Sequence, residues 1–322
     1  WAWYLRSYFH EICGEYSAAL AMVDKAIEHT PTGVDLYELK ARILKASGDI
    51  EAAAECLDVG RDLDKQDRYI NNQTTKYMLQ ANKAEVALER ISLFVKEEGN
   101  PEQMLSDMQC SWYELELAEC LRRKSDWGKS LKKFTSVVKH FEDWHEDQFD
   151  FHSYCIRKGT LRAYLDVLRF AEELWGLDNY ARAAEGISRL YLHLYDNPNL
   201  TKEDEEPDYS SMTAAERKKA KAIARKKKKA AEKKMEEEKA AAAEAANANQ
   251  KKGAKPAVID EDPNGEALLK RDPLEEAKKF SAILSRHAPS RLSTWLLQYD
   301  VAIRRKKAVL AMQALFKGRA LD

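Results

Sequence analysis

Hydrophobic and polar residues follow the period of an amphipathic helix along most of this chain, and the pattern repeats after 34 residues. The first copy carries bulky residues, a turn glycine and small residues in a fixed order: Trp3, Gly14, Tyr16, Ala19, Val23, Ala26 and Pro31. A shift of 34 positions meets residues of the same character at Tyr37, Gly48, Ala53, Leu57 and Gly60. Small side chains allow two helices to cross closely, so the sequence predicts helix pairs that stack on one another.

The later copies of the pattern are less regular. A shift of 68 positions meets Ala87 and Ile91, but Asn82 stands in the place of the glycine. A shift of 111 positions meets the bulky residues of a fourth copy at Trp127, Leu131 and Phe134. The nine additional residues are expected near residues 97–107, where a Gly-Asn-Pro run predicts a loop.

This spacing is typical of tetratricopeptide repeats. We therefore predict an all-α protein, a tetratricopeptide-type helical-repeat superhelix (an α-solenoid) with a protruding basic helix. An ordinary antiparallel helix bundle is the alternative. A solenoid has a concave surface, and such surfaces commonly bind a partner.

Changes in composition divide the chain into five predicted segments. Residues 1–145 hold the tetratricopeptide-type repeats, and residues 146–200 hold further helical pairs of the superhelix. Residues 201–248 begin as an acidic loop and continue as a long helix rich in Lys, Ala and Glu. Residues 249–272 are expected to be a flexible linker, and residues 273–322 to be truncated helical repeat material.

Charge is balanced in total but segregated along the chain, which has 53 Lys and Arg against 54 Asp and Glu. One run holds nine cations and no acid: Arg217, Lys218, Lys219, Lys221, Arg225, Lys226, Lys227, Lys228 and Lys229. Large apolar residues are nearly absent there, so the predicted helix has no stripe to bury and is expected to stand off the body in solvent. These cations are candidates for binding the phosphates of ribosomal RNA, and a nuclear localisation signal is the alternative.

The sequence contains few candidates for a catalytic, metal or cofactor site. Its closest glycines, Gly176 and Gly186, are ten residues apart, so no glycine-rich loop for a nucleotide or coenzyme can be drawn. His140 and His145 lack the i, i+4 spacing of metal-binding helices. The five cysteines form no C-x-x-C pair, and no apolar run reaches the roughly 18 residues of a membrane span. We expect no catalytic residue, metal site or cofactor site in this chain, and no membrane contact.

One polar cluster suits an anion. If a helix begins near His152, then Tyr154, Lys158 and Arg162 lie on one line at i, i+4 and i+8, opposite the apolar face. Two cations and a phenol on one line could bind a negatively charged group. A solvated face with ion pairs to nearby aspartates is the alternative.

Several stretches closely resemble a known family. The longest is DQFDFHSYCIRK at residues 147–158, which continues through Thr160, Leu161 and Arg162. RYINN at residues 68–72, KYML at 76–79, MQC at 108–110 and LYDNP at 194–198 occur in the same order as in that family. The chain thus resembles the large auxiliary subunit of the N-terminal acetyltransferase A complex over most of residues 1–200. The resemblance is compositional in the Lys/Glu segment and thin after Asp272.

The resemblance implies a non-catalytic scaffold. In that family the subunit is a ring-like superhelix that wraps a small catalytic subunit of the GNAT fold, shapes its active site and anchors the complex at the ribosomal tunnel exit. Acetyl-coenzyme A is bound by the catalytic subunit, and a small huntingtin-interacting regulatory protein binds the same scaffold. The chain is therefore expected to be cytoplasmic and ribosome-associated.

The resemblance also suggests an identity for the anion. Inositol hexakisphosphate lies at the boundary of the two main subunits in several family members, which favours an inositol phosphate on the predicted cationic line. Its candidate residues are Tyr154, Lys158 and Arg162, joined by His152, Arg157 and, from the neighbouring helix pair, Lys132 and Lys133.

Two other functions stay open at the level of sequence. One is a ribosome- or RNA-associated repeat adaptor without an acetyltransferase partner, and the other is a nuclear import substrate or chromatin scaffold. The motif from Phe149 to Arg162 favours the acetyltransferase scaffold, because binding driven by charge alone does not require it.

Overall fold

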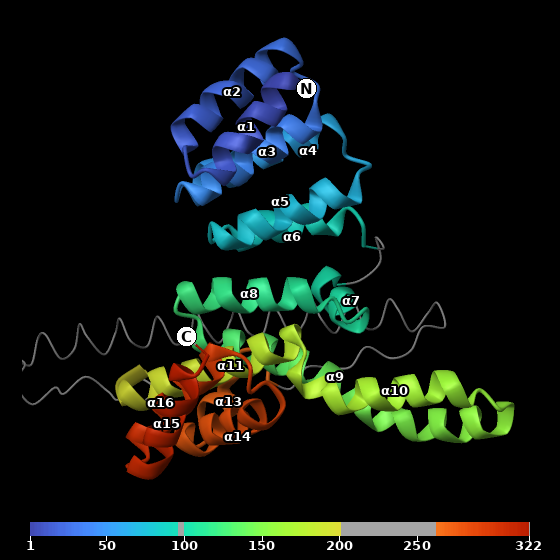
Figure 1. The fold of residues 1–322 in the computed structure, drawn as a ribbon, viewed down its shortest axis with the longest axis vertical. Coiled ribbons are helices and arrows are strands. Elements are labelled where there is room, and N and C mark those ends of the chain that lie inside the picture. Colours follow the sequence, from blue (N-terminus) through green and yellow to red (C-terminus); the bar gives the residue numbers. More distant parts are fainter. Residues whose placement is uncertain (96–99, 201–261, 322) are drawn as a thin grey trace, which may run out of the picture.

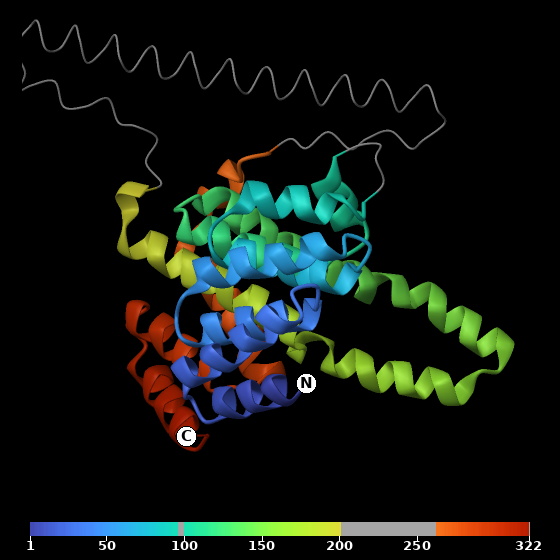
Figure 2. The same cartoon turned by 90° about the horizontal axis from the view of Figure 1, so that it is seen from above.

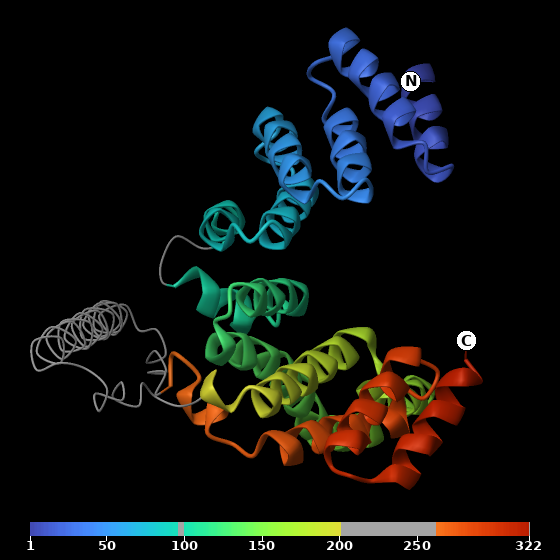
Figure 3. The same cartoon turned by 90° about the vertical axis from the view of Figure 1, so that its left-hand side faces the viewer.

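The computed structural model describes residues 1–95, 100–200 and 262–321, and the structural statements below concern these residues. They form helices that stack into an open arc, with the two chain ends on the same side of it (Figure 3). Every regular element in the described ranges is a helix. The predicted all-α superhelix is confirmed.

The first part of the arc consists of helix pairs, whose first and second members we call the A and B helices. The pairs are α1 (Ala2–Ile12) with α2 (Tyr16–His29), α3 (Val34–Ala46) with α4 (Ile50–Leu63), α5 (Arg68–Gln80) with α6 (Ala84–Ser92), and α8 (Ser111–Arg123) with α9 (Trp127–Lys158). The pairs follow one another along the axis of the arc (Figure 1). Of the middle pairs, α3 and α5 lie toward the inner side and α4 and α6 toward the outer side (Figure 3).

Small residues lie where the helices of a pair cross. Ala19, Ala53 and Ala87 occupy the same position in three successive B helices, and each is fully buried. Gly60 approaches Tyr37 so closely that a Cβ on the glycine would come within 2.8 Å of the tyrosine's Cβ. Larger side chains here would force the helices apart.

The turn inside a pair requires a residue with a left-handed backbone. Gly14 and Gly48 have φ angles of 74° and 98°, and Asn82 and Ser125 take the equivalent place with φ angles of 61°. Glycine adopts this conformation without steric cost, and asparagine tolerates it. The asparagine that weakens the third sequence copy therefore preserves its turn.

The insertion before the fourth pair is partly helical, and the prediction of a loop over residues 97–107 is wrong from residue 101 onward. A short helix, α7 (Pro101–Asp107), begins where Asn100 caps it by accepting a hydrogen bond from the backbone N–H of Glu102 at 2.9 Å. Proline suits the first position of a helix because its missing N–H is not needed there. Leu105 is buried in the core beneath and holds α7 in place.

The second part of the arc contains longer helices. They are α10 (Leu161–Glu173), η1 (Leu174–Gly176), α11 (Asp178–Asp196), η2 (Pro198–Leu200), α13 (Glu266–Leu269), α14 (Pro273–His287), α15 (Leu292–Arg304) and α16 (Ala308–Arg319). The boundary expected between residues 145 and 146 falls inside the continuous helix α9. The repeat material expected at residues 273–322 corresponds to α14, α15 and α16, and α14 packs on α11 in the largest core cluster.

The end of the predicted linker is not a free linker. Asp262 caps α13 by accepting hydrogen bonds from the backbone N–H groups of Glu266 and Ala267 at 2.8 and 2.9 Å. The hydroxyl of Tyr191 donates to the carbonyl oxygen of Leu268 at 3.1 Å, and Leu268 and Leu269 pack against the core. Residues 262–272 therefore form a strap across α9 and α11. Removal of their apolar side chains from water stabilises this arrangement.

Two other predicted segments cannot be compared with the structure. The acidic loop and protruding basic helix at residues 201–248, with residues 249–261 of the linker, lie outside the described residues.

A buried polar network ties α7, α8 and α9 together. Both carboxylate oxygens of Glu114 are engaged, Oε1 accepting from the hydroxyl of Ser136 and Oε2 lying near Nε2 of His140, each at 2.7 Å. The hydroxyl of Ser106 lies 3.2 Å from that of Ser136. Burial favours the neutral form of Glu114, but the hydrogen bonds outweigh it and lower the pKa of the carboxyl below its ordinary value of 4.5.

This network makes a prediction about stability and pH. Because the pKa of Glu114 is lower in the folded chain, its contribution to the free energy of unfolding is complete above pH 4.5 and is lost as pH falls through the folded-state pKa. Glu114→Gln should cost about 1–3 kcal/mol at neutral pH and flatten the stability profile below pH 4.5. Urea unfolding across pH measures both, with the exposed Glu28→Gln as control. A variant profile parallel to that of the wild type would contradict the prediction.

Candidate partner-binding surfaces

The most prominent surface is a hairpin of α9 and α10 that extends away from the arc (Figure 1 and Figure 2). Helix α9 has 32 residues, which corresponds to about 48 Å at 1.5 Å per residue. Its first half packs in the core, whereas none of the residues of α10 is buried. The two helices hold each other through aromatic contacts, such as Trp144 with Phe170 at 5.4 Å between ring centroids.

The cationic line predicted from the sequence does not exist as one helix face. Helix α9 does not begin near His152 but runs on to Lys158, and Gly159 ends it with a φ of 67°. Arg162 belongs to the next helix, α10. The left-handed glycine turns the chain back, so Lys158 and Arg162 belong to two different helices, one before and one after the turn.

Lys132 and Lys133 are not near this tip, although we expected them to join the site from a neighbouring pair. They lie on α9 itself, twenty residues before His152, or about 30 Å along the helix. The ammonium of Lys132 donates to the carbonyl oxygen of Asp262 at 2.6 Å, and that of Lys133 pairs with Glu102 at 2.7 Å. Both therefore hold neighbouring segments to α9.

His152 is also engaged within the hairpin. Its Nδ1 lies 2.7 Å from the hydroxyl of Tyr164 on α10, and the two rings meet edge to face. Tyr154 is half exposed and stacks on Phe151, with 6.3 Å between ring centroids. Of the predicted residues, His152 thus joins the two helices, and Tyr154 faces solvent.

The hairpin tip brings together the remaining predicted cations. Arg157, Lys158 and Arg162 are exposed, and within the described ranges their side chains form no ion pair or hydrogen bond. The exposed apolar residue Ile156 directly precedes Arg157, and the exposed Leu161 directly precedes Arg162. The tip therefore presents three unneutralised charges on an apolar base.

Several large apolar residues of the hairpin are exposed to solvent. Ile156, Leu161, Leu165 and Phe170 expose between 44% and 67% of their surface. Leu161 and Leu165 are four residues apart on α10 and therefore lie on one side of that helix, and exposed apolar residues that neighbour one another often mark a binding surface. We call this set the hairpin face.

A second surface follows the A helices and was missed by the sequence analysis. Tyr8, Arg42 and Lys76 occupy equivalent positions 34 residues apart. The guanidinium of Arg42 lies 5.1 Å from the ring centroid of Tyr8, and the ammonium of Lys76 lies 5.4 Å from that of Trp112. We call these four residues the A-helix row. The 34-residue spacing of Tyr8, Arg42 and Lys76 was the available signal in the sequence, but the repeat was recognised from its small and apolar positions alone.

The two terminal helices of the arc each carry an exposed apolar stripe. On α1, Leu5 and Phe9 are 63% and 62% exposed, whereas the equivalent Leu39 and Ile43 of α3 are 2% and 0% exposed. The preceding helix α2 packs with Leu39 and Ile43 in one cluster. The outer face of α1 is therefore the kind of surface that a neighbouring helix covers.

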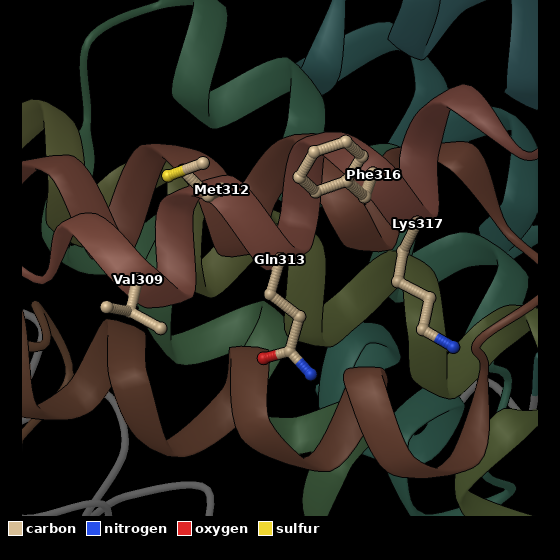
Figure 4. A pocket seen from close by; sticks show the side chains of 5 residues that line it. All are labelled: Val309, Met312, Gln313, Phe316 and Lys317. Atoms are coloured by element: carbon tan, nitrogen blue, oxygen red, sulfur yellow. The ribbon is translucent and has the colours of Figure 1, made fainter.

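The stripe on α16 borders an open hollow. It is lined by Val309, Met312, Gln313, Phe316 and Lys317, which follow one face of the helix (Figure 4). The spacing of these residues is that of a helix that packs on another helix.

Two kinds of site have no support in the described residues. No group of three or more His, Cys, Asp or Glu side chains there is arranged to hold a metal ion. Among the helices of residues 1–95, 100–200 and 262–321, none has the length and apolar character of a membrane span.

Comparison with known proteins places this arc in one family. The family model described as N-terminal acetyltransferase A, auxiliary subunit, matches residues 1–318. The chain is 44% identical to the Arabidopsis thaliana N-terminal acetyltransferase A complex auxiliary subunit NAA15 over 98% of this chain and 35% of that protein. It is 38% identical to the Homo sapiens N-alpha-acetyltransferase 16, NatA auxiliary subunit, over 100% of this chain and 38% of that protein.

A solved structure from the same family is also similar to this chain. A structure of Naa15/Naa10 bound to HypK-THB matches with a TM-score of 0.73 and 34% identity, over 95% of this chain and 38% of that chain. This chain thus spans little more than a third of the length of the relatives it matches. It belongs to the family of N-terminal acetyltransferase A auxiliary subunits.

Proposed function

We propose that this chain is part of a non-catalytic scaffold that binds and shapes a GNAT-type catalytic subunit for co-translational N-terminal α-acetylation. The observation that carries the proposal is the structural match to Naa15, a protein solved together with Naa10 and HypK-THB. By the same argument, a small huntingtin-interacting regulatory protein is a second proposed partner. Acetyl-coenzyme A would be bound by the catalytic partner.

The surfaces of the arc suit this role. The hairpin face presents exposed apolar residues on a projecting pair of helices. Such residues contribute favourable free energy when a partner removes them from water. The A-helix row adds cations held against aromatic rings on successive repeats. A partner that contacts both the hairpin face and the A-helix row would be held in one orientation relative to the arc.

Charge substitutions in the hairpin face test the catalytic partner. Leu161→Glu combined with Leu165→Glu should weaken co-purification of the GNAT subunit at least tenfold, because two carboxylates would have to be buried at the interface. Acetylation of a peptide that begins with Ser or Ala should fall accordingly, and the chain alone should show no turnover.

Val59→Glu is the matched control, since Val59 is equally exposed but lies on α4. Loss of the partner in this control, or turnover that scales with the isolated chain, would contradict the proposal.

The proposal for inositol hexakisphosphate rests on the tip cations Arg157, Lys158 and Arg162. A highly phosphorylated ligand would neutralise charges that have no partner within the described chain, and would raise the thermal unfolding temperature by mass action. Arg157 and Lys158 approach it from α9, and Arg162 from α10.

Lys158→Glu should abolish the thermal shift that inositol hexakisphosphate produces. Lys76→Glu serves as the comparison, because Lys76 belongs to the A-helix row and not to the tip. An unchanged shift in Lys158→Glu together with a lost shift in Lys76→Glu would move the anion site to that row.

The ribosome is the third proposed partner, and its contact is the basic run from Arg217 to Lys229. Nine cations spaced along the helix that the sequence predicts would bind RNA phosphates without reading bases, and such binding falls steeply with salt. An acetyltransferase scaffold anchored in this way would act in the cytoplasm, where chains emerge from the ribosome.

Replacement of Lys226–Lys229 by glutamate should release the complex from ribosomes at moderate salt and leave peptide acetylation in solution intact. Co-sedimentation over a salt series measures the first effect. A variant that sediments with the same salt dependence as the wild type would exclude the basic run as the anchor.

A further inference from the structure

Two hydroxyl residues at helix–helix turns follow the same arrangement of cations. Ser125 comes after Arg122 and Arg123, and Thr160 comes after Arg157 and Lys158, at positions −3 and −2 in both cases. Protein kinases that read positive charge before the acceptor recognise this arrangement through acidic groups in their substrate groove. The sequence alone does not choose between the two residues.

The cations before Ser125 are already used by the fold. The guanidinium of Arg123 donates to the side chain of Asn82 at 2.8 Å and to the carbonyl oxygen of Leu79 at 2.9 Å. Arg122 pairs with Glu119 at 2.8 Å. Ser125 itself holds the left-handed turn between α8 and α9. A kinase would have to break the packing of α8 on α5 to read this turn.

The cations before Thr160 are free of such contacts. Arg157 and Lys158 are exposed at the end of the projecting hairpin, and in the described part of the chain no acid pairs with them. The Thr160 side chain makes no capping hydrogen bond, and the apolar Leu161 follows it in an exposed position.

The hairpin tip can also unfold locally with a small increase in free energy. Helix α10 buries none of its residues, so few contacts oppose local unfolding around Gly159. Kinases bind acceptors in an extended conformation, and a segment with few buried contacts can adopt it without disturbing the arc. Ser125 lacks this freedom because α8 and α9 both pack in the core next to it.

We propose that Thr160 is a phosphorylation site for a protein kinase that recognises arginine and lysine on the amino-terminal side of its acceptor. The Oγ of Thr160 attacks the γ-phosphorus of ATP and forms a new O–P bond. The bond from that phosphorus to the β–γ bridging oxygen breaks, and ADP leaves. The hydroxyl proton passes to the catalytic aspartate of the kinase.

The modification would change the charge of the tip. A phosphothreonine carries about −1.5 to −2 charges at neutral pH, which is roughly half to two-thirds of the positive charge of Arg157, Lys158 and Arg162. The tip would then bind polyanions less tightly. This consequence rests on the inositol phosphate site proposed above, whereas the phosphorylation itself does not.

The test uses the full chain with the catalytic subunit of cyclic-AMP-dependent protein kinase and ATP, followed by mass spectrometry of the modified peptides. One phosphate on Thr160 is expected, lost in Thr160→Ala and kept in Thr160→Ser. Arg157→Ala should lower the initial rate at least tenfold. Ser153→Ala is the matched control, because Ser153 is exposed on the same hairpin but follows no cation, and its rate should equal that of the wild type.

Other outcomes overturn the proposal. Phosphate found chiefly on Ser125, incorporation that persists in Thr160→Ala, or no incorporation would each show that the tip is not the acceptor. A separate measurement compares the thermal shift given by inositol hexakisphosphate before and after modification. An equal shift in the fully phosphorylated chain would remove the tip as an anion site and leave the phosphorylation site standing.

Discussion

The arc depends on the close crossing of two helices within each repeat. Ala19, Ala53 and Ala87 are fully buried at equivalent positions, and the contact of Gly60 with Tyr37 leaves no room for a Cβ. Because the crossing is close, neighbouring pairs also meet at a fixed distance, and long side chains can reach across. The A-helix row and the hydrogen bonds from Gln80 and Arg182 to Glu116 are consequences of that distance.

Polar links of this kind contribute little to stability. An exposed or half-exposed ion pair contributes little free energy, so the links at Glu116 connect successive helix pairs at little gain in stability. The network at Glu114 is different, because its carboxylate is buried and both oxygens are engaged. It joins the inserted helix α7 to the regular pairs, so the insertion extends the stack without interrupting it.

The two halves of helix α9 belong to two different parts of the structure. Its first half is the B helix of the fourth pair, and its second half, with α10, forms the hairpin outside the arc. The strap at residues 262–272 closes over the first half and lets α14 pack on α11. The chain thereby combines a closely packed arc with a projecting hairpin whose helix α10 buries none of its residues, an arrangement that would suit the proposed scaffold.

The sequence by itself determined the helix pairs, their spacing and the family. These features are local, since a 34-residue pattern of small and apolar residues predicts which faces pack. The sequence was insufficient to predict features that depend on contacts between distant segments. Periodicity could not show that α9 continues to Lys158 or that Lys132 donates a hydrogen bond to Asp262. Nor could it show that a segment with Pro and Gly would pack Leu268 against the core. Those features were decided by tertiary packing, because whether a helix ends or a strap docks depends on the surface that the rest of the chain presents.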